Sequence, residues 1–371
     1  MKKISIGLPK MHKESGEKRD FLPDFVNHLL KHDARVVLEQ GYGSQLGLIP
    51  ADYQNANPAV QFGSQKEVYQ SDIVLILRAP TREELERMRF GSCLISMMHY
   101  HTRPQRVAML RELGIQAISL DSIRDDSGRR MIENFNAVAW NGTQAAFQLL
   151  ESIYPKPGFM HPDRPPIRAT LIGAGALGGK TIRAAVRYGN EEKHRKMVES
   201  HIPGVIVRAV DADVTSQEKV MRDLLNTTDV LIDASSRMDS TQPIIPNEWI
   251  ADLPKHAVIL DLAVDPYQET PIGFYTKGVE GIPQGNLDQY VFAPHDAVFD
   301  ELPEWITKTH RRHVVSCYSW PGIHPKRCMK IYGDQLRPLM RTLISLGGIE
   351  GIHSGGHFFE RAIARAFLPS E

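Results

Sequence analysis

Three polar side chains stand where a parallel β-sheet would present them to a ligand. Arg78 ends the apolar run DIVLILR, His99 follows the apolar run CLISMM, and Arg19 comes after the first apolar run of the chain. The carboxyl ends of parallel strands are where α/β sheets bind ligands. A guanidinium can hold a carboxylate through two parallel hydrogen bonds, and an imidazole can exchange protons near neutral pH. We therefore expect this part of the chain to bind a small carboxylate-bearing substrate, with His99 as acid or base.

A second chemical signal is the stretch Gly173-Ala-Gly175-Ala176-Leu177-Gly178, which directly follows an apolar run and opens a helical pattern. In such a loop Gly173 allows a tight turn, Gly175 leaves room for a pyrophosphate, and Gly178 lets the helix approach the strand. The N–H groups and the positive end of the helix favour an anion. The pattern predicts dinucleotide binding by this loop, and the alternative is a tight glycine turn with no ligand.

A carboxylate at the end of the next apolar run bears on the choice of dinucleotide. GVIVRAVD ends at Asp211, where an acid would accept the adenosine ribose 2′-OH of NAD. The 2′-phosphate of NADP would face a like charge there. Asp211 comes 33 residues after Gly178, whereas about 20 residues are usual. Asp213 is therefore an alternative ribose acid, and either aspartate could instead be a solvated turn residue. The sequence favours NAD.

The elements that must position these residues alternate along the chain in an α/β rhythm. In the first part we expect helices near 21–32, 81–89 and 103–113, between strands at 4–8, 35–40, 72–77, 92–98 and 116–121. In the second part we expect strands at 168–175, 204–211, 229–235, 257–265 and 313–320. A long helix at 134–153 lies between the two series, and two helices follow at 326–368. The predicted fold class is α/β with two Rossmann-like, doubly wound parallel sheets.

Composition limits the classes of partner. The 371 residues carry 44 Lys and Arg against 44 Asp and Glu, so there is no global charge to attract nucleic acid or an anionic membrane. Apolar residues make up 42%, typical of a globular protein, and no run reaches the roughly 20 residues of a membrane span. The three cysteines and the histidines form no recognised disulfide or metal pattern. We expect a cytoplasmic protein of two domains that acts on small molecules and holds no metal.

These motifs resemble the alanine dehydrogenase and pyridine nucleotide transhydrogenase family, with more distant similarity to saccharopine dehydrogenase and carboxyethylornithine synthase. IGLPK with KESGEKR resembles the family's opening, FGSCLISMMHYH the segment of its catalytic histidine, and DLAVDP the motif whose last aspartate lies near the nicotinamide. The resemblance implies substrate binding by Arg19 and catalysis by His99 and Asp265. It also implies cofactor binding by the glycine loop, Asp211 and, from its position, Asn136.

The resemblance further implies a topology. Residues 1–131 and 326–371 would form a substrate domain that is discontinuous in sequence, and residues 132–325 would form the NAD-binding domain inserted into it. An interdomain cleft would bring the substrate to the nicotinamide. Because relatives often assemble, a homo-oligomer is also expected.

One position departs from the family pattern. Alanine dehydrogenases have a lysine where this chain has Arg78. A guanidinium can hold a carboxylate but is not deprotonated under ordinary conditions, so proton transfer would fall on His99 and Asp265. A long segment after Asp265 also has no counterpart in simple alanine dehydrogenases. We expect an NAD(H)-dependent amino-acid dehydrogenase with a remodelled substrate pocket.

Two other functions stay open. An opine-type or saccharopine-type imine reductase would join an amino acid to a 2-oxo acid and would use similar groups, with room for a second carboxylate. A noncatalytic NAD-binding sensor would bind the dinucleotide without turnover. A sensor would not require Arg19, His99 and Asp265 together, which disfavours it.

Overall fold

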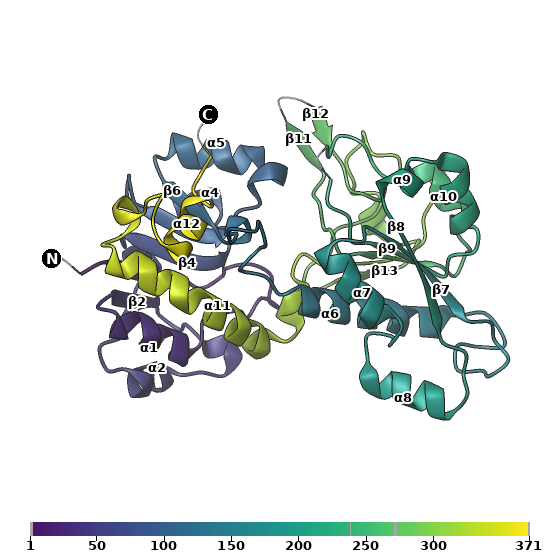
Figure 1. The fold of residues 1–371 in the computed structure, drawn as a ribbon, viewed down its shortest axis with the longest axis horizontal. Coiled ribbons are helices and arrows are strands. Elements are labelled where there is room, and N and C mark those ends of the chain that lie inside the picture. Colours follow the sequence, from purple (N-terminus) through teal and green to yellow (C-terminus); the bar gives the residue numbers. More distant parts are fainter. Residues whose placement is uncertain (1–2, 238, 271–272, 370–371) are drawn as a thin grey trace. The chain divides into compact units, whose positions relative to one another are not determined.

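The computed structural model describes residues 3–237, 239–270 and 273–369, which form two compact α/β units (Figure 1). Unit 1 consists of Met1–Asn134 together with His324–Glu371, and unit 2 consists of Phe135–Ile323. Each unit is built around its own six-stranded sheet. The predicted fold class, α/β with two parallel sheets, is confirmed.

The sheet of unit 1 has the order β3-β2-β1-β4-β5-β6, and all neighbouring strands are parallel. Its strands are β1 (Ser5–Leu8), β2 (Arg35–Glu39), β3 (Gln61–Gly63), β4 (Ile73–Arg78), β5 (Cys93–Met97) and β6 (Gln116–Ser119). The apolar residues of β4 are buried without alternation, as in a strand covered on both faces. The strand order reverses at β1, so the carboxyl ends of β1 and β4 form a topological switch point.

Helices from both ends of the chain cover the sheet of unit 1. They are α1 (Pro23–Lys31), α2 (Pro50–Ala56), α3 (Gln65–Tyr69), α4 (Arg82–Leu85), α5 (Pro104–Glu112), α11 (Pro325–Ser345) and α12 (Phe358–Ala364). Helices α1 and α11 lie against each other (Figure 1), and Leu336 and Leu343 of α11 belong to the same core as Phe25 and Leu29 of α1. The C-terminal helices therefore complete the core of the unit that the N-terminal residues begin.

The sheet of unit 2 has the order β13-β14-β10-β9-β7-β8, in which only β13 is antiparallel to its neighbour among the described strands. Its strands are β7 (Ile167–Ile172), β8 (Val205–Val210), β9 (Val230–Asp233), β10 (Val258–Asp261), β13 (Val291–Phe292) and β14 (His313–Ser316). A separate hairpin joins β11 (Gln268–Thr270) to β12 (Gly273–Tyr275). The switch point of this sheet lies at β7, between β8 and β9.

Helices cover both faces of the unit 2 sheet. They are α6 (Phe135–Ile153), α7 (Ala176–Ala185), α8 (Glu191–Glu199), α9 (Ala212–Thr215) and α10 (Glu218–Leu225). Phe147 of α6 packs with Leu171 in one core cluster, whereas Met221 of α10 packs with Leu231 in another. Along the described part of the chain, no helix is both long and apolar enough to cross a membrane.

Some predicted elements differ from the observed ones. The expected helix at 81–89 ends at Leu85, and the expected strand at 313–320 ends at Ser316. The polar segment after α7 forms the helix α8, which the sequence pattern did not predict. The short strands β3, β11, β12 and β13 were also not predicted.

Candidate active site

Arg19 and Arg78, the two predicted substrate-binding arginines, share one glutamate in unit 1. Arg78 ends β4, and its Nη1 donates to Glu14 Oε1 at 2.8 Å and to Glu17 Oε2 at 3.1 Å. Arg19 lies in the segment after β1 and is only 5% exposed. Its Nε donates to Glu17 Oε1 at 2.8 Å. The switch point of the first sheet thus carries two guanidinium groups and two carboxylates.

Glu17 and Arg19 stabilise each other's charged forms. Burial alone would raise the pKa of Glu17, but Arg19 and Arg78 hold it at about 2. Burial likewise opposes the charge on Arg19, and the Glu17 carboxylate more than compensates, so the pKa of Arg19 is raised. A substrate carboxylate would therefore have to share these guanidinium groups with glutamates. Glu14 and Glu17 were not predicted, although both lie in the KESGEKR segment.

His99 follows β5 and is held by an aspartate from the neighbouring strand. Its φ of 52° is in the left-handed region, which costs a residue other than glycine about 1–3 kcal/mol. Asp121 follows β6, and its Oδ1 accepts the backbone N–H of His99 at 3.1 Å and the Ser119 hydroxyl at 2.6 Å. The His99 side chain is 48% exposed, and its Nδ1 lies 3.5 Å from Asp121 Oδ2. Asp121 therefore holds both the backbone N–H and the imidazole ring of His99.

The electrostatics favour a neutral imidazole beside an ionised carboxylate. Desolvation by the surrounding protein, helped by Arg130, Arg103 and Arg106, lowers the pKa of His99 despite the opposing effect of Asp121. Desolvation would raise the pKa of Asp121, but His99, the Ser119 hydroxyl and Arg130 lower it to about 2. His99 is thus able to accept a proton at neutral pH. Asp121 was not predicted, because only the pairing of β5 with β6 brings it to His99.

Replacing Asp121 with asparagine tests this pairing through the pH profile. The amide keeps a hydrogen-bond acceptor for the His99 backbone but removes the charge that stabilises the imidazolium. We expect the pKa of His99 to fall further, so the acid limb of kcat/KM should move to lower pH. The measurement is a pH–rate profile of wild type and Asp121→Asn. An unchanged acid limb would contradict the assignment of that limb to His99.

The glycine loop of unit 2 connects β7 to α7. Gly173 has a φ of 91°, and a Cβ there would lie 2.8 Å from the Ala234 carbonyl oxygen. A Cβ on Gly178 would lie 2.0 Å from the Gly173 carbonyl oxygen, so the helix approaches the loop too closely for a side chain. A Cβ on Gly175, in contrast, would meet no heavy atom within 4 Å. The fold itself therefore demands Gly173 and Gly178, and the absence of a side chain at Gly175 leaves open space.

That space is part of a pocket of about 570 Å³ within unit 2. Its walls include Asn136, Trp140, Gly175, Ala176, Gly179, Lys180 and Arg183. Lys180 Nζ donates to Asn136 Oδ1 at 3.5 Å, so Asn136 holds a cation beside the loop. The start of α7 and the two cationic side chains suit an anionic group such as a pyrophosphate. The residues present thus fit a dinucleotide; Leu177 instead packs against the core.

Asp211 lies at the carboxyl end of β8, beside β7. It is exposed and begins α9, and its Oδ1 accepts the N–H of Ala212 at 3.0 Å. Its second oxygen can accept a ribose hydroxyl without loss of this cap. Asp213 is also exposed and lies in the first turn of α9. The position at the strand end favours Asp211 over Asp213 as the ribose acid.

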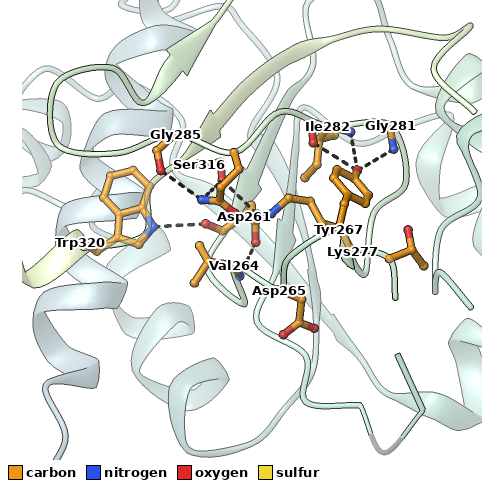
Figure 2. A network of polar contacts seen from close by, with 12 residues as sticks. Asp261, Val264, Asp265, Tyr267, Lys277, Gly281, Ile282, Gly285, Ser316 and Trp320 are labelled. Carbon is orange, nitrogen blue, oxygen red and sulfur yellow. Dashed lines mark hydrogen bonds and ion pairs between the residues drawn. The ribbon is translucent and has the colours of Figure 1, made fainter. Parts of the chain in front are cut away.

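Asp265 lies in the turn after β10, beside a network of polar contacts (Figure 2). Its Oδ2 accepts a hydrogen bond from Arg237 Nη2 at 2.7 Å. Arg237 is largely buried and also donates to the Thr276 carbonyl at 2.6 Å. Arg237 follows β9 and was not predicted; its position shortly after the apolar run DVLIDAS was the available signal.

Two parallel α/β sheets, one of them with a strand–glycine loop–helix junction at its switch point, define a two-domain protein of the Rossmann-like class. Residues 7–139 match the family model described as "Alanine dehydrogenase/PNT, N-terminal domain". Alanine dehydrogenase of Bacillus subtilis (strain 168) is 23% identical over 273 residues, 70% of each chain. NAD(P) transhydrogenase subunit alpha of Haemophilus influenzae is 22% identical over 354 residues, 91% of this chain and 66% of the relative.

Solved structures give the same result for the fold. A structure described as L-alanine dehydrogenase matches with a TM-score of 0.70 at 19% identity, over 98% of this chain and 94% of that one. The transhydrogenase from Sinorhizobium meliloti matches with a TM-score of 0.62 at 16% identity, over 92% and 94%. Residues 7–139 thus match the N-terminal domain of the alanine dehydrogenase/PNT family, and the chain as a whole is similar to alanine dehydrogenases and transhydrogenase alpha subunits, as the resemblance of its motifs predicts.

Proposed function

We propose that this protein is an NAD(H)-dependent amino-acid dehydrogenase that moves a hydride between the nicotinamide and the Cα of an amino acid or its imine. The observation that supports this most is the order of groups along one sheet edge of unit 1. Arg78 ends β4, His99 follows β5 and Asp121 follows β6, and these three strands are neighbours. Such an edge offers both a carboxylate anchor and a proton acceptor.

In this proposal each side chain has a separate role. Arg19 and Arg78 bind the substrate carboxylate and fix which face of Cα is presented. His99 Nε2 accepts the proton from the substrate amine, because Nδ1 is turned toward Asp121. Asp265 stabilises positive charge as the amine becomes an imine and orients the water that attacks it. NAD⁺, when bound, supplies the hydride acceptor.

A second candidate function is an imine reductase that joins an amino acid to a 2-oxo acid. The observation in its favour is the number of cations near His99. The side chains of Arg103, Arg106 and Arg130 lie close enough to His99 to affect its pKa. A substrate with a second carboxylate could use one of them.

A coupled NADH assay over amine and oxo-acid pairs separates these functions. We expect NADH consumption with 2-oxo acids, pyruvate among them, and ammonia. Consumption with pyruvate plus ornithine or lysine, but not with ammonia, would replace the dehydrogenase with the imine reductase. Dinucleotide binding without turnover on the whole panel would indicate a sensor and would contradict both enzymatic functions.

A further inference from the structure

We propose that Lys277 is a positioning residue for Asp265, and that it acts through the buried carboxylate of Asp261. The inference rests on the proposed function, since it assumes that Asp265 serves the substrate. Lys277 belongs to the long segment after Asp265 for which the sequence predicts no counterpart in simple alanine dehydrogenases. Its role would explain part of what that segment does.

Asp261 is the centre of the network, because both of its carboxylate oxygens and its backbone carbonyl oxygen accept hydrogen bonds (Figure 2). It ends β10, and its Oδ1 accepts the N–H of Val264 at 2.7 Å. Its Oδ2 accepts Lys277 Nζ at 2.8 Å and the Ser316 hydroxyl at 3.0 Å. Its carbonyl oxygen accepts the indole N–H of Trp320 at 3.1 Å. The carboxylate thus ties the turn to Lys277 and to Ser316 at the end of β14, and the backbone carbonyl of Asp261 ties it to Trp320.

The turn that carries Asp265 is strained and needs this support. Val264 has a φ of 52°, and a β-branched side chain disfavours the left-handed region strongly. Such a conformation costs about 1–3 kcal/mol and persists only where surrounding contacts enforce it. The hydrogen bond from the Val264 N–H to Asp261 Oδ1 is the contact that enforces it here. Because Asp265 is the next residue, the direction of its carboxylate depends on this bond.

Lys277 is an unusual residue to find at such a position. Its side chain is 1% exposed, and that of Asp261 is 2% exposed. Lys277 Nζ also donates to Gln284 Oε1 and lies 5.9 Å from the ring centroid of Tyr267. Replacing a buried ion pair with apolar residues is often neutral or stabilising, so stability alone gives little reason for this pair. The contacts instead indicate that Lys277 is there to fix the position of the Asp261 carboxylate.

The charges around Asp261 give Lys277 a second effect. Asp233 is buried at the end of β9, and burial together with Asp261 and Asp265 raises its pKa to about 6. A Cβ on Gly278 would lie 2.1 Å from Asp233 Oδ2, so the residue next to Lys277 also packs against this carboxylate. Without the ammonium of Lys277, less positive charge would offset the repulsion between the carboxylates of Asp261 and Asp233. The Asp261 carboxylate would then no longer be held beneath the turn.

The same segment also touches the other side of Asp265. Arg237 Nη2 donates to Asp265 Oδ2 at 2.7 Å and to the carbonyl oxygen of Thr276 at 2.6 Å. Thr276 directly precedes Lys277. Residues 276–277 therefore connect to the Asp265 turn through Asp261 and to the Asp265 side chain through Arg237.

Lys277→Met tests the proposal, with Lys308→Met as the matched control. Lys308 lies in the same segment, but its Nζ donates to the carbonyl oxygens of Leu302 at 2.7 Å and Asp300 at 3.2 Å, and among the described residues it makes no hydrogen bond to Asp261 or Asp265. In Lys277→Met we expect hydrogen exchange of the Val264 amide to accelerate by at least about tenfold, because its acceptor is released. We also expect kcat to fall by about 10- to 100-fold, with NADH affinity unchanged, because Asp265 is displaced. Lys308→Met should match wild type in all three measurements.

A double-mutant cycle separates positioning from a general loss of structure. Asp261→Asn should reproduce both effects, because an amide oxygen that accepts from Lys277 and Ser316 leaves the amide nitrogen, which cannot accept, facing the Val264 N–H. The double variant should lose no more activity than the worse single variant, because both residues act through one contact. Additive losses in kcat would overturn the proposal. If Lys277→Met does not fold, Lys277→Gln is the deciding variant. Wild-type exchange at Val264 and wild-type kcat in a folded Lys277 variant would also overturn it.

The exchange measurement keeps this inference separate from the proposed function. Protection of the Val264 amide is measured on the full chain without any substrate. If wild type turns over no substrate pair but Lys277→Met still loses protection at Val264, the proposed function fails while the link from Lys277 to the Asp265 turn stands. If wild type turns over substrate and Lys277→Met retains full protection, the inference fails alone.

Discussion

His99→Asn is expected to lower kcat by about 10²- to 10⁴-fold, the usual contribution of a general acid or base. Asparagine tolerates the left-handed backbone that His99 adopts at a φ of 52°, so the loop should keep its conformation. The amide cannot accept the proton that leaves the substrate amine. Steady-state kinetics with the best substrate pair measures the loss.

His101→Asn is the matched control for this prediction. His101 is exposed and lies in the short helical turn Tyr100–Thr102 that follows His99. We expect its kcat within about twofold of wild type, since it has no assigned contact with the substrate. NADH affinity should be retained in both variants. A His99→Asn protein that is folded and as active as wild type would remove His99 from the chemistry.

Gly175→Val is expected to weaken NADH binding by more than about tenfold, or 1.4 kcal/mol. A Cβ at this position meets no heavy atom of the protein within 4 Å, so the folded protein accommodates a side chain. The same side chain fills the space beside the start of α7 where the pyrophosphate would lie. Fluorescence titration with NADH measures the affinity, and thermal unfolding measures stability.

Gly204→Val is the control for the substitution itself. A Cβ on Gly204 also meets no heavy atom within 4 Å, and Gly204 lies before β8, outside the pocket at the glycine loop. We expect this variant to bind NADH as wild type does. The midpoint of thermal unfolding should change little in either variant. Normal NADH affinity in Gly175→Val would place the dinucleotide somewhere other than this loop.

Apolar runs predicted the central strands, because a strand buried on both faces has few polar positions. DIVLILR forms β4 and the run at 257–265 contains β10, each fully buried apart from Arg78. Short edge elements carry no such signal. β3 has three residues and only one of them is buried.

The helix α8 shows why a polar segment can form a helix that the sequence pattern does not predict. Among its residues only Met197 is buried, so it lacks an apolar stripe. Its support is local: the Asn190 side chain caps its first turn, and Lys196 pairs with Glu192 one turn away. Such contacts are common on helix surfaces and add only tenths of a kcal/mol each.

Motifs located candidate site residues but not the groups that hold them. His99 and Asp265 were proposed from the segments in which they occur. Asp121 contacts His99, Arg237 contacts Asp265, and Lys277 contacts Asp261 at the base of the Asp265 turn, and these contacts arise from strand pairing and from the path of a long segment. The spacing of residues in the sequence does not say which strand ends become neighbours. These partners could therefore be identified only in the structure.

Transfer of deuterium from NADH tests the central claim most directly. NADH labelled at C4 on either face would be incubated with the protein, ammonia and a panel of 2-oxo acids, and the products examined by mass spectrometry and NMR. The account predicts an amino acid that carries one deuterium at Cα. Bound NADH that transfers no label to Cα of any product, or label found only in a second dinucleotide, would contradict it.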